Sequence, residues 1–454
     1  MSGLAAGRTG ARVLVFAAAM LLTAQAEALS AQVPIEVEPG MPFAAPPPEL
    51  LNARRQRLLD SIGTGVAILK SAAMKSIEGD YPQDSDFRQE NDFFYLTGLE
   101  TPDSWLLLAA RPDGSRSETL FIPERHPAQE QWTGRKPSFA EATTVSGIRD
   151  VRAAGGFSQS LGRSGGLPLP RGVPIYLPLN RKARGDPVFE RLVFDSGAQV
   201  RDLDPVMARL RLVKDEFEIR MLRRAIGITT GAQRAAMEVA RPGMYEYELE
   251  AVIEFNFRKG GAERLGFPSI IGSGPNSVVL HYDKSRRRME AGDLVVMDVG
   301  AEYSYYSADV TRTIPVTGRF TPRQRRIYDL VLATQNAAME AVRPGATMAQ
   351  LGRVARAYLR EHSGDACGSR TCDAYFIHGL GHWLGMDVHD VGDYSTPLRA
   401  GMVITVEPGI YLPEENLGVR IEDDVLVTES GYEVLSRAAP TNPAEIEALI
   451  QSDR

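Results

Sequence analysis

The sequence has few of the residues on which small scaffolds and thiolate metal sites depend. Its 454 residues include only two cysteines, six histidines and three tryptophans. Two cysteines exclude a disulfide-dense scaffold and cannot complete a four-thiolate zinc site. Acidic residues outnumber basic ones, for a net charge of -7, and no basic block alternates with aromatic residues, so we expect no nucleic-acid partner.

The amino-terminal residues are typical of a secretion signal. Two arginines precede an apolar run at 13–22, which is too short to cross a bilayer core, and a small-x-small cleavage pattern follows at 24–26. We therefore expect a signal peptide at 1–31 and a flexible leader at 32–49 that stiffens toward the three prolines at 46–48. After cleavage the protein would be exported, periplasmic or secreted, with no membrane partner.

The two cysteines, Cys367 and Cys372, lie five positions apart. In an exported protein this spacing favours a small disulfide loop. Two free thiols remain the alternative, because the oxidising compartment is itself inferred from the signal peptide.

The rest of the chain divides into two domains. Residues 50–205 mix helical stretches with short β-rich runs, which predicts an α/β domain. These runs lie at 64–69, 105–109 and 173–177. The second domain, 206–454, opens with a helix for which Asp215 and Glu218 have the spacing of a capping box.

The second domain repeats one set of landmarks in the same order. Each copy has a helix that ends in Arg-Pro-Gly and, further on, an Ala-Gly pair separated by five residues from a carboxylate, Asp298 or Glu407. A histidine precedes each carboxylate, by seventeen residues for His281 and by eighteen for His389. The Arg-Pro-Gly motifs lie at 241–243 and 343–345, and the Ala-Gly motifs lie at 291–292 and 400–401. We infer two related halves in which paired helices lead into β-strands.

Two aspartates in the first half suggest a cation site. Asp298 lies in an apolar run typical of a buried strand, and Asp309 follows after a segment whose midpoint is 303–304. A tight hairpin there would make the aspartates cross-strand neighbours, with Cβ atoms about 5 Å apart. Close carboxylates repel unless a cation lies between them. On this segment alone, one buried aspartate in a hydrogen-bond network and one exposed aspartate is an equally good interpretation.

Further acids and clustered histidines strengthen the metal hypothesis. Glu407 and Glu422 also lie in apolar, strand-like runs, and His378, His382 and His389 fall within twelve positions. Oxygen ligands with one imidazole suit Mn(II), Co(II), Fe(II) or Zn(II). A two-metal centre, with ions roughly 3.5 to 4 Å apart, needs bridging carboxylates of this kind.

Taken together, these segments resemble the pita-bread metallopeptidases, and most closely the Xaa-Pro aminopeptidases (aminopeptidase P) and prolidases. The resemblance rests on 273–282, the Asp298 and Asp309 pair, 378–382, 406–409 and 420–424, and 87–98 and 132–135 look like that family's amino-terminal domain. It implies an α+β fold with a pita-bread catalytic domain, which contains an internal pseudo-two-fold repeat, at 206–454. A smaller α/β domain of the creatinase and aminopeptidase P type would precede it at 50–205.

The resemblance also implies a ligand set for two divalent metal ions, for which Mn(II) is the first expectation and Zn(II), Co(II) or Fe(II) are alternatives. The implied ligands are Asp298, Asp309, His382, Glu407 and Glu422, with Asp309 and Glu422 bridging both ions. Glu407 would also be the catalytic base. His281 and His389 would contact the scissile carbonyl, whereas His378 would lie behind the ligands or near the substrate.

Three further residues have less specific roles. Arg420 and Tyr411 would orient ligands or substrate, although strand packing and a surface charge carry similar weight. Trp132 would reach the active site of a neighbouring subunit, as the family allows, so we expect a homo-oligomer. Packing on an exposed surface is an equally good interpretation of Trp132.

The implied activity is hydrolysis of the Xaa-Pro bond at the amino terminus of peptides with proline second, by a water that bridges the two ions. A prolidase limited to dipeptides is the alternative, because the sequence does not fix the length of the pocket. Methionyl aminopeptidase would not need the large amino-terminal domain. A non-catalytic binding protein with this fold is disfavoured, because all five ligand positions hold competent residues.

Overall fold

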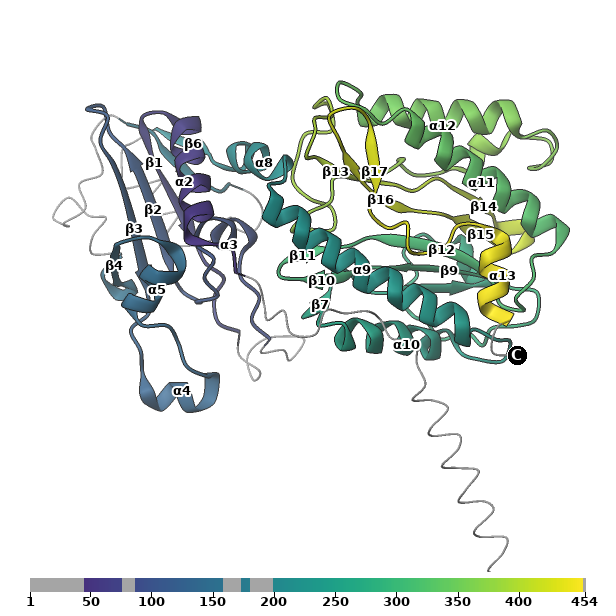
Figure 1. Cartoon of the computed structure of the whole chain (residues 1–454), viewed down its shortest axis with the longest axis horizontal. Coiled ribbons are helices and arrows are strands. Elements are labelled where there is room, and N and C mark those ends of the chain that lie inside the picture. The colour runs from purple at the N-terminus through teal and green to yellow at the C-terminus, as the bar shows by residue number, and fades with distance from the viewer. Residues whose placement is uncertain (1–44, 76–85, 158–172, 180–198, 452–454) are drawn as a thin grey trace, which may run out of the picture.

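The computed structural model describes residues 45–75, 86–157, 173–179 and 199–451. They form two domains that lie side by side and are joined through helix α8 (Asp204–Leu212) (Figure 1). Within these ranges no helix is long and apolar enough to cross a membrane. The expected signal peptide and residues 32–44 of the expected leader lie outside the described residues. The last two residues of that leader, 48 and 49, begin helix α2 (Pro48–Ile62).

The amino-terminal domain is built on one six-stranded mixed sheet in the order β4-β3-β2-β1-β5-β6. Its strands are β1 (Gly65–Lys70), β2 (Trp105–Ala110), β3 (Arg116–Ile122), β4 (Asp150–Ala153), β5 (Ile175–Leu177) and β6 (Val200–Asp202). Its other helices are α3 (Asn91–Thr97), α4 (Pro127–Thr133), α5 (Phe139–Ser146) and the 3₁₀ turn η1 (Ala154–Gly156). The three β-rich runs seen in the sequence are β1, β2 and β5, so the predicted α/β domain is confirmed.

The second domain contains two helix pairs around several small sheets. The helices are α9 (Glu216–Val239), α10 (Glu246–Lys259), α11 (Pro322–Glu340), α12 (Met348–His362) and α13 (Pro443–Gln451). In Figure 1, α9 and α10 lie below the strands, and α11 and α12 lie above them. Asp215 and Glu218 form the predicted capping box of α9: each side chain accepts a hydrogen bond from the other residue's backbone N–H.

The strands of this domain fall into two sets that correspond to its halves. The first set is β7 (Arg264–Leu265), β8 (Ile270–Ser273), β9 (Leu294–Val299), β10 (Ala301–Tyr303), β11 (Tyr306–Ser307) and β12 (Val310–Pro315). The second set is β13 (Val403–Val406), β14 (Gly409–Leu412), β15 (Leu417–Arg420), β16 (Asp423–Val427) and β17 (Tyr432–Val434). Sheets β12-β9-β8 and β13-β16-β17 are the central sheets of the two sets. Short 3₁₀ turns η2 (Gly274–Val278), η3 (Cys372–Tyr375) and η4 (Pro413–Glu415) connect these elements.

The repeat read from the sequence is also present in the backbone. The glycines that end the Arg-Pro-Gly motifs, Gly243 and Gly345, have φ values of 93° and 88°. The glycines of the Ala-Gly motifs, Gly292 and Gly401, have φ values of 97° and 87°. Such positive φ angles favour glycine, so matched turns require the same residue in both halves.

The hairpin between Asp298 and Asp309 differs from its prediction by one residue. The turn is Ser304-Tyr305, with φ values of 47° and 73°, and Asp298 pairs with Thr311 rather than with Asp309. The two aspartates are therefore diagonal neighbours on the same face of the sheet. Tyr305 explains the shift, because its ring stacks on Phe94 of the amino-terminal domain at 3.9 Å between centroids.

The predicted disulfide is confirmed. Cys367 and Cys372 are joined, with 5.3 Å between their Cα atoms. The bond closes a short loop between α12 and η3, and the backbone N–H of Cys372 donates to Ser363 Oγ at the end of α12.

Candidate metal centre

The four predicted acidic ligands come from strands or from the residues directly beside them. Asp298 lies inside β9, whereas Asp309, Glu407 and Glu422 each lie one residue outside β12, β13 and β16. Ligands of this kind are held by the regular backbone of the neighbouring strand. The backbone N–H of Glu422 also donates to Thr311 O at 3.1 Å, which joins the two halves at the site.

All five predicted ligands converge. His382 Nε2 lies 3.2 Å from Asp309 Oδ2 and 3.9 Å from Glu407 Oε1. Asp309, His382 and Glu422 each offer a ligand atom, and these atoms lie within 4.8 Å of one another. Asp298 completes the group, because it lies close enough to Asp309 for its charge to raise the pKa of Asp309.

Gly381 and Thr405 determine the position of His382. The backbone N–H of His382 donates to Thr405 Oγ1, and its carbonyl accepts from the Thr405 N–H. This approach requires a glycine before the histidine, because a Cβ on Gly381 would lie 2.0 Å from the Thr405 carbonyl oxygen. His382 Nδ1 lies 3.1 Å from Trp383 O, which can only accept, so Nδ1 carries the proton. The lone pair of Nε2 therefore faces the carboxylates.

The acidic cluster is electrostatically unfavourable on its own. Burial raises the pKa of Asp309 well above its usual range, and the charges of Asp298, Asp424 and Glu407 raise it further. The pKa of Glu422 is raised in the same way by burial and by Asp309. Burial also raises the pKa of Glu407 to about 7. Without a cation, these groups hold protons near neutral pH.

The charges and unpaired acceptors fit two divalent ions. Among the described residues, Oδ1 of Asp298, of Asp309 and of Asp424 is buried without a hydrogen-bond partner. The guanidinium of Arg420 neutralises one carboxylate, with its Nη2 2.5 Å from Asp298 Oδ2. It cannot balance the four ligand carboxylates and Asp424 together. Two divalent cations match the charge of the four ligands, and carboxylate oxygens with one imidazole suit such ions.

Arg420 and Tyr411 connect the ligands to their surroundings. Arg420 is 3% exposed, which excludes a surface charge, and its Nη1 donates to the Tyr411 hydroxyl at 2.9 Å. Its Nε donates to Thr311 Oγ1, which in turn donates to Glu422 Oε2 at 2.6 Å. A single guanidinium therefore contacts one ligand directly and a second through a threonine.

His378 lies behind Glu407 and outside the ligand cluster. Its Nδ1 is 3.5 Å from Glu407 Oε2 and 2.8 Å from Gly379 O, and its Nε2 is 2.8 Å from the Tyr411 hydroxyl. Burial lowers the pKa of His378 to about 4, with a further contribution from Arg420. The imidazole is therefore neutral at pH 7.

His281 and His389 lie on the exposed side of the cluster. The ring of His389 is 4.0 Å from the ring of His382 between centroids. Burial lowers the pKa of His389, and the charges of His382 and His281 lower it further. By contrast, Trp132 is 89% exposed on α4, at the end of the amino-terminal domain away from the catalytic domain in Figure 1. It does not reach the metal centre of its own chain.

Known proteins share both domains. Residues 220–429 match the model of metallopeptidase family M24, and residues 51–165 match that of the aminopeptidase P amino-terminal domain. The Xaa-Pro aminopeptidase of Escherichia coli (strain K12) is 36% identical over 441 residues, which covers 88% of this chain and 97% of that protein. The chain belongs to metallopeptidase family M24.

Solved M24 structures have the same fold. Aminopeptidase P from E. coli with the inhibitor Pro-Leu matches with a TM-score of 0.82 and 34% identity, covering 90% of this chain and 100% of that chain. The Zn-substituted E. coli enzyme in complex with product matches with a TM-score of 0.82 and 35% identity, over the same shares of the two chains. The expected pita-bread domain after an aminopeptidase P-type domain is thus confirmed.

Several residues that organise the M24 site were not found from the sequence. Gln233 and Gln335 each lie eight residues before an Arg-Pro-Gly motif, one in each half. Gln233 Nε2 donates to the carbonyls of Met297 and Val310, each at 2.9 Å, beside Asp298 and Asp309. Gln335 Nε2 donates to the carbonyls that precede Glu407 and Glu422, at 3.0 and 3.1 Å. Their equal spacing from the Arg-Pro-Gly motifs was the sequence feature that could have identified these two glutamines.

Asp424 was also missed, although it lies two residues after Glu422. Its Oδ2 accepts from the backbone N–H of Asp309 at 3.2 Å, and burial raises its pKa well above the usual range. It therefore positions a ligand from behind the cluster. The sequence places three acids in a row at 422–424, and nothing in that run distinguishes their roles.

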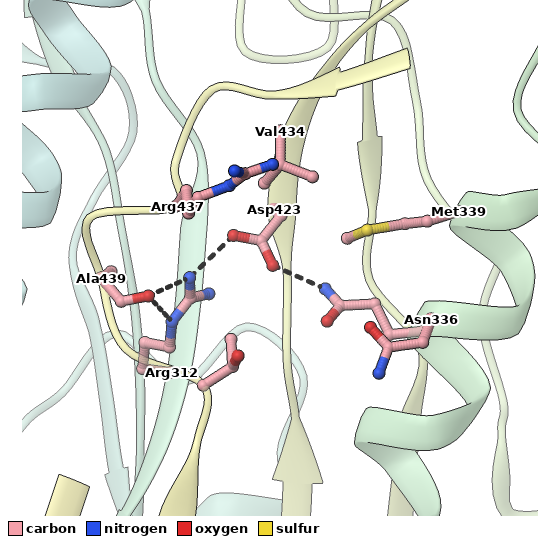
Figure 2. Close-up of a pocket in the computed structure, with 9 residues that line it drawn as sticks. Arg312, Asn336, Met339, Asp423, Val434, Arg437 and Ala439 are labelled. Atoms are coloured by element: carbon pink, nitrogen blue, oxygen red, sulfur yellow. Dashed lines mark hydrogen bonds and ion pairs between the residues drawn. The ribbon is translucent and has the colours of Figure 1, made fainter. Parts of the chain in front are cut away.

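A pocket of about 170 Å³ on the far side of β16 is separate from the metal centre. Figure 2 shows the guanidinium of Arg312 between the carboxylate of Asp423 and the carbonyl of Ala439. Arg312 also donates to the carbonyl oxygens of Thr311 and Glu422. The polar groups of the pocket are paired with one another, so the pocket supports the start of β16, directly after Glu422, and none of the predicted ligands lines it.

We expect the metal-free protein to lose stability as the pH rises. The folded-state pKa of Glu407 is about 7 against an ordinary 4.5, and those of Asp309 and Glu422 are also raised. The folded state therefore binds more protons than the unfolded state, and the associated stability is present below pH 4.5 and lost as the pH rises through 7. Between pH 5 and 8 the free energy of unfolding should fall by about 1–3 kcal/mol in chelator, as measured by urea unfolding.

Glu407→Gln is the matched control for this pH dependence. The variant removes one of the acids whose pKa is raised, so its unfolding free energy should change less over the same pH range. A wild-type free energy that stays level or rises between pH 5 and 8 in chelator would contradict the assignment of a repulsive cluster.

Proposed function

We propose that this chain is a metal-dependent aminopeptidase that releases the first residue from peptides with proline second. The convergence of Asp298, Asp309, His382, Glu407 and Glu422 is the observation that carries the proposal. The named relatives are Xaa-Pro aminopeptidases over nearly their whole length, which favours this activity over that of a prolidase.

The five ligands would hold two divalent ions, with Asp309 and Glu422 between them. Such ions supply Lewis-acid chemistry: they polarise the scissile carbonyl and lower the pKa of bound water toward neutrality. We propose Mn(II) as the native metal because four of the five ligands are carboxylates, which suit hard ions of this kind. The Zn(II) of the Zn-substituted E. coli enzyme is a property of that protein. Zn(II), Co(II) and Fe(II) therefore remain alternatives for this chain.

Glu407 is the proposed general base. Its pKa of about 7 allows the carboxylate to accept a proton from the attacking water and then donate it to the leaving proline nitrogen at neutral pH. A proline nitrogen in a peptide bond has no hydrogen to donate. A site that requires no such donor therefore accepts the Xaa-Pro bond.

His281 and His389 are proposed to contact the carbonyl oxygen of that bond. A neutral imidazole can donate one N–H hydrogen bond to an oxygen that gains negative charge. The lowered pKa of His389 keeps its ring neutral at pH 7. Its position beside His382 places this donor next to the ligand cluster.

Export and assembly complete the proposal. The basic, apolar and small-residue pattern of residues 1–31 supports export to the periplasm or the medium. The 89% exposed Trp132 supports a homo-oligomer in which this ring lies at a neighbour's active site. Protein recovered from the cell envelope or the medium with Met1 still in place would contradict cleavage of a signal peptide. A molar mass of one chain, measured by light scattering, would contradict the homo-oligomer.

Metal removal should abolish hydrolysis reversibly. A chelator is expected to lower the rate on an Xaa-Pro-Xaa tripeptide by at least about 100-fold, because both Lewis-acid functions are lost. Adding Mn(II) should restore it, as followed by release of the first residue. Metal-independent turnover would refute the mechanism, and turnover of an Xaa-Pro dipeptide alone would instead indicate a prolidase.

Glu407→Ala should leave the protein folded and remove activity. The change deletes both a metal ligand and the proposed base, so we expect kcat to fall by at least about 1,000-fold. Circular dichroism and metal content measured on the same sample would separate loss of fold, of metal and of base. Full retained activity would show that Glu407 does not have the assigned role.

A further inference from the structure

The loop at 383–392, which carries His389, is built around a buried carboxylate that is not a predicted ligand. This carboxylate belongs to Asp390, the residue directly after His389. The Asp390 N–H donates to Trp383 O at 2.8 Å, which closes the loop on itself. A Cβ on Gly385 would lie 2.1 Å from Asp390 Oδ2, so the carboxylate rests against the glycine backbone.

The partners of Asp390 come from the segment that joins the two domains. Arg211 Nη2, at the end of α8, lies 2.5 Å from Asp390 Oδ1, and Lys214 Nζ lies 3.0 Å from Oδ2. All three side chains are buried. Burial alone would favour a neutral acid, but the two cations lower the pKa of Asp390 below its usual value, so it is ionised.

Arg211 also binds the amino-terminal domain. Its Nη1 donates to Asp92 Oδ1 of α3 at 2.8 Å, and its Nη2 lies 3.0 Å from Asp387 in the same loop. Two further residues of the amino-terminal domain contact this loop, because Arg88 and Asn91 both donate to the carbonyl of Met386. One guanidinium thus connects the amino-terminal domain, the linker and the backbone that carries His389.

We propose that Arg211 is a positioning residue for catalysis: through Asp390 it fixes the backbone at His389, so docking of the amino-terminal domain sets the geometry of that imidazole. This inference rests on the proposed function, in which His389 contacts the scissile carbonyl. Consecutive Cα atoms lie about 3.8 Å apart, so a displaced Asp390 carries His389 with it. A misplacement of about 1 Å at a reacting group can cost roughly 100-fold in rate.

Arg54 provides a matched comparison. It too is a buried arginine that joins the domains, with its Nη2 2.8 Å from Asp215 Oδ2 and 3.6 Å from Glu218 Oε2. Its hydrogen bonds and ion pairs go to Tyr95, Asp215 and Glu218, and none goes to the loop at 383–392. Loss of Arg54 therefore weakens the joint between the domains but removes neither ion-pair partner of Asp390.

A double-mutant cycle on the full chain loaded with Mn(II) tests the inference. Arg211→Met should lower kcat on an Xaa-Pro-Xaa tripeptide by about 10- to 100-fold, with metal content unchanged and KM altered by less than about 3-fold. In a His389→Ala background the same change should cost less than about 3-fold, because the group that Arg211 positions is already absent. Arg54→Met should change the rate by the same factor in both backgrounds.

Equal losses from Arg211→Met with and without His389 would overturn the inference, as would an unchanged kcat in the single variant. If Arg211→Met does not fold, Asp390→Asn enters the same cycle with the same expected and contrary results, since it removes the charge while keeping the size of the side chain. A folded, metal-loaded wild-type protein that does not cleave the tripeptide would refute the proposed function itself. That failure is distinct, because no variant is needed to observe it.

Discussion

Repulsion between buried carboxylates is the constraint on which the catalytic domain depends. Asp298, Asp309, Glu407 and Glu422 lie together in a site where burial raises the pKa of at least three of them. A chain gains no stability from such a cluster by itself, because desolvation and like charge both oppose it. Divalent cations convert the same arrangement into a binding site. The stability that the metal-free protein loses to carboxylate repulsion is therefore a consequence of its function.

The rest of the domain holds these groups together despite their repulsion. Each half contributes a helix whose glutamine, Gln233 or Gln335, donates to the carbonyls beside the ligands. Arg420 supplies one fixed positive charge between the halves. The pseudo-two-fold repeat therefore provides two equivalent supports, and the site forms where they meet. The linker adds a third support on the histidine side, where Arg211 reaches Asp390.

The sequence was most informative where function conflicts with local structure. Acids in apolar, strand-like runs and a repeated set of turns indicated the acidic candidates, whereas the family resemblance implied the fold and the full ligand set, including the choice of His382 over His378. The hairpin was misplaced by one residue because Ser304-Tyr305 is not a typical turn pair, and its position depends on Tyr305 packing against Phe94, about two hundred residues away. Asp424 and Arg211 were missed for the same physical reason, since their partners are known only once distant segments meet.

The most direct test of the central claim is anomalous diffraction from crystals of the protein grown with Mn(II). We expect two peaks about 3.5 to 4 Å apart, both within ligand distance of Asp309 and Glu422, with His382 on only one of them. A single peak, or peaks elsewhere in the molecule with Arg420 alone neutralising the acids, would contradict the claim.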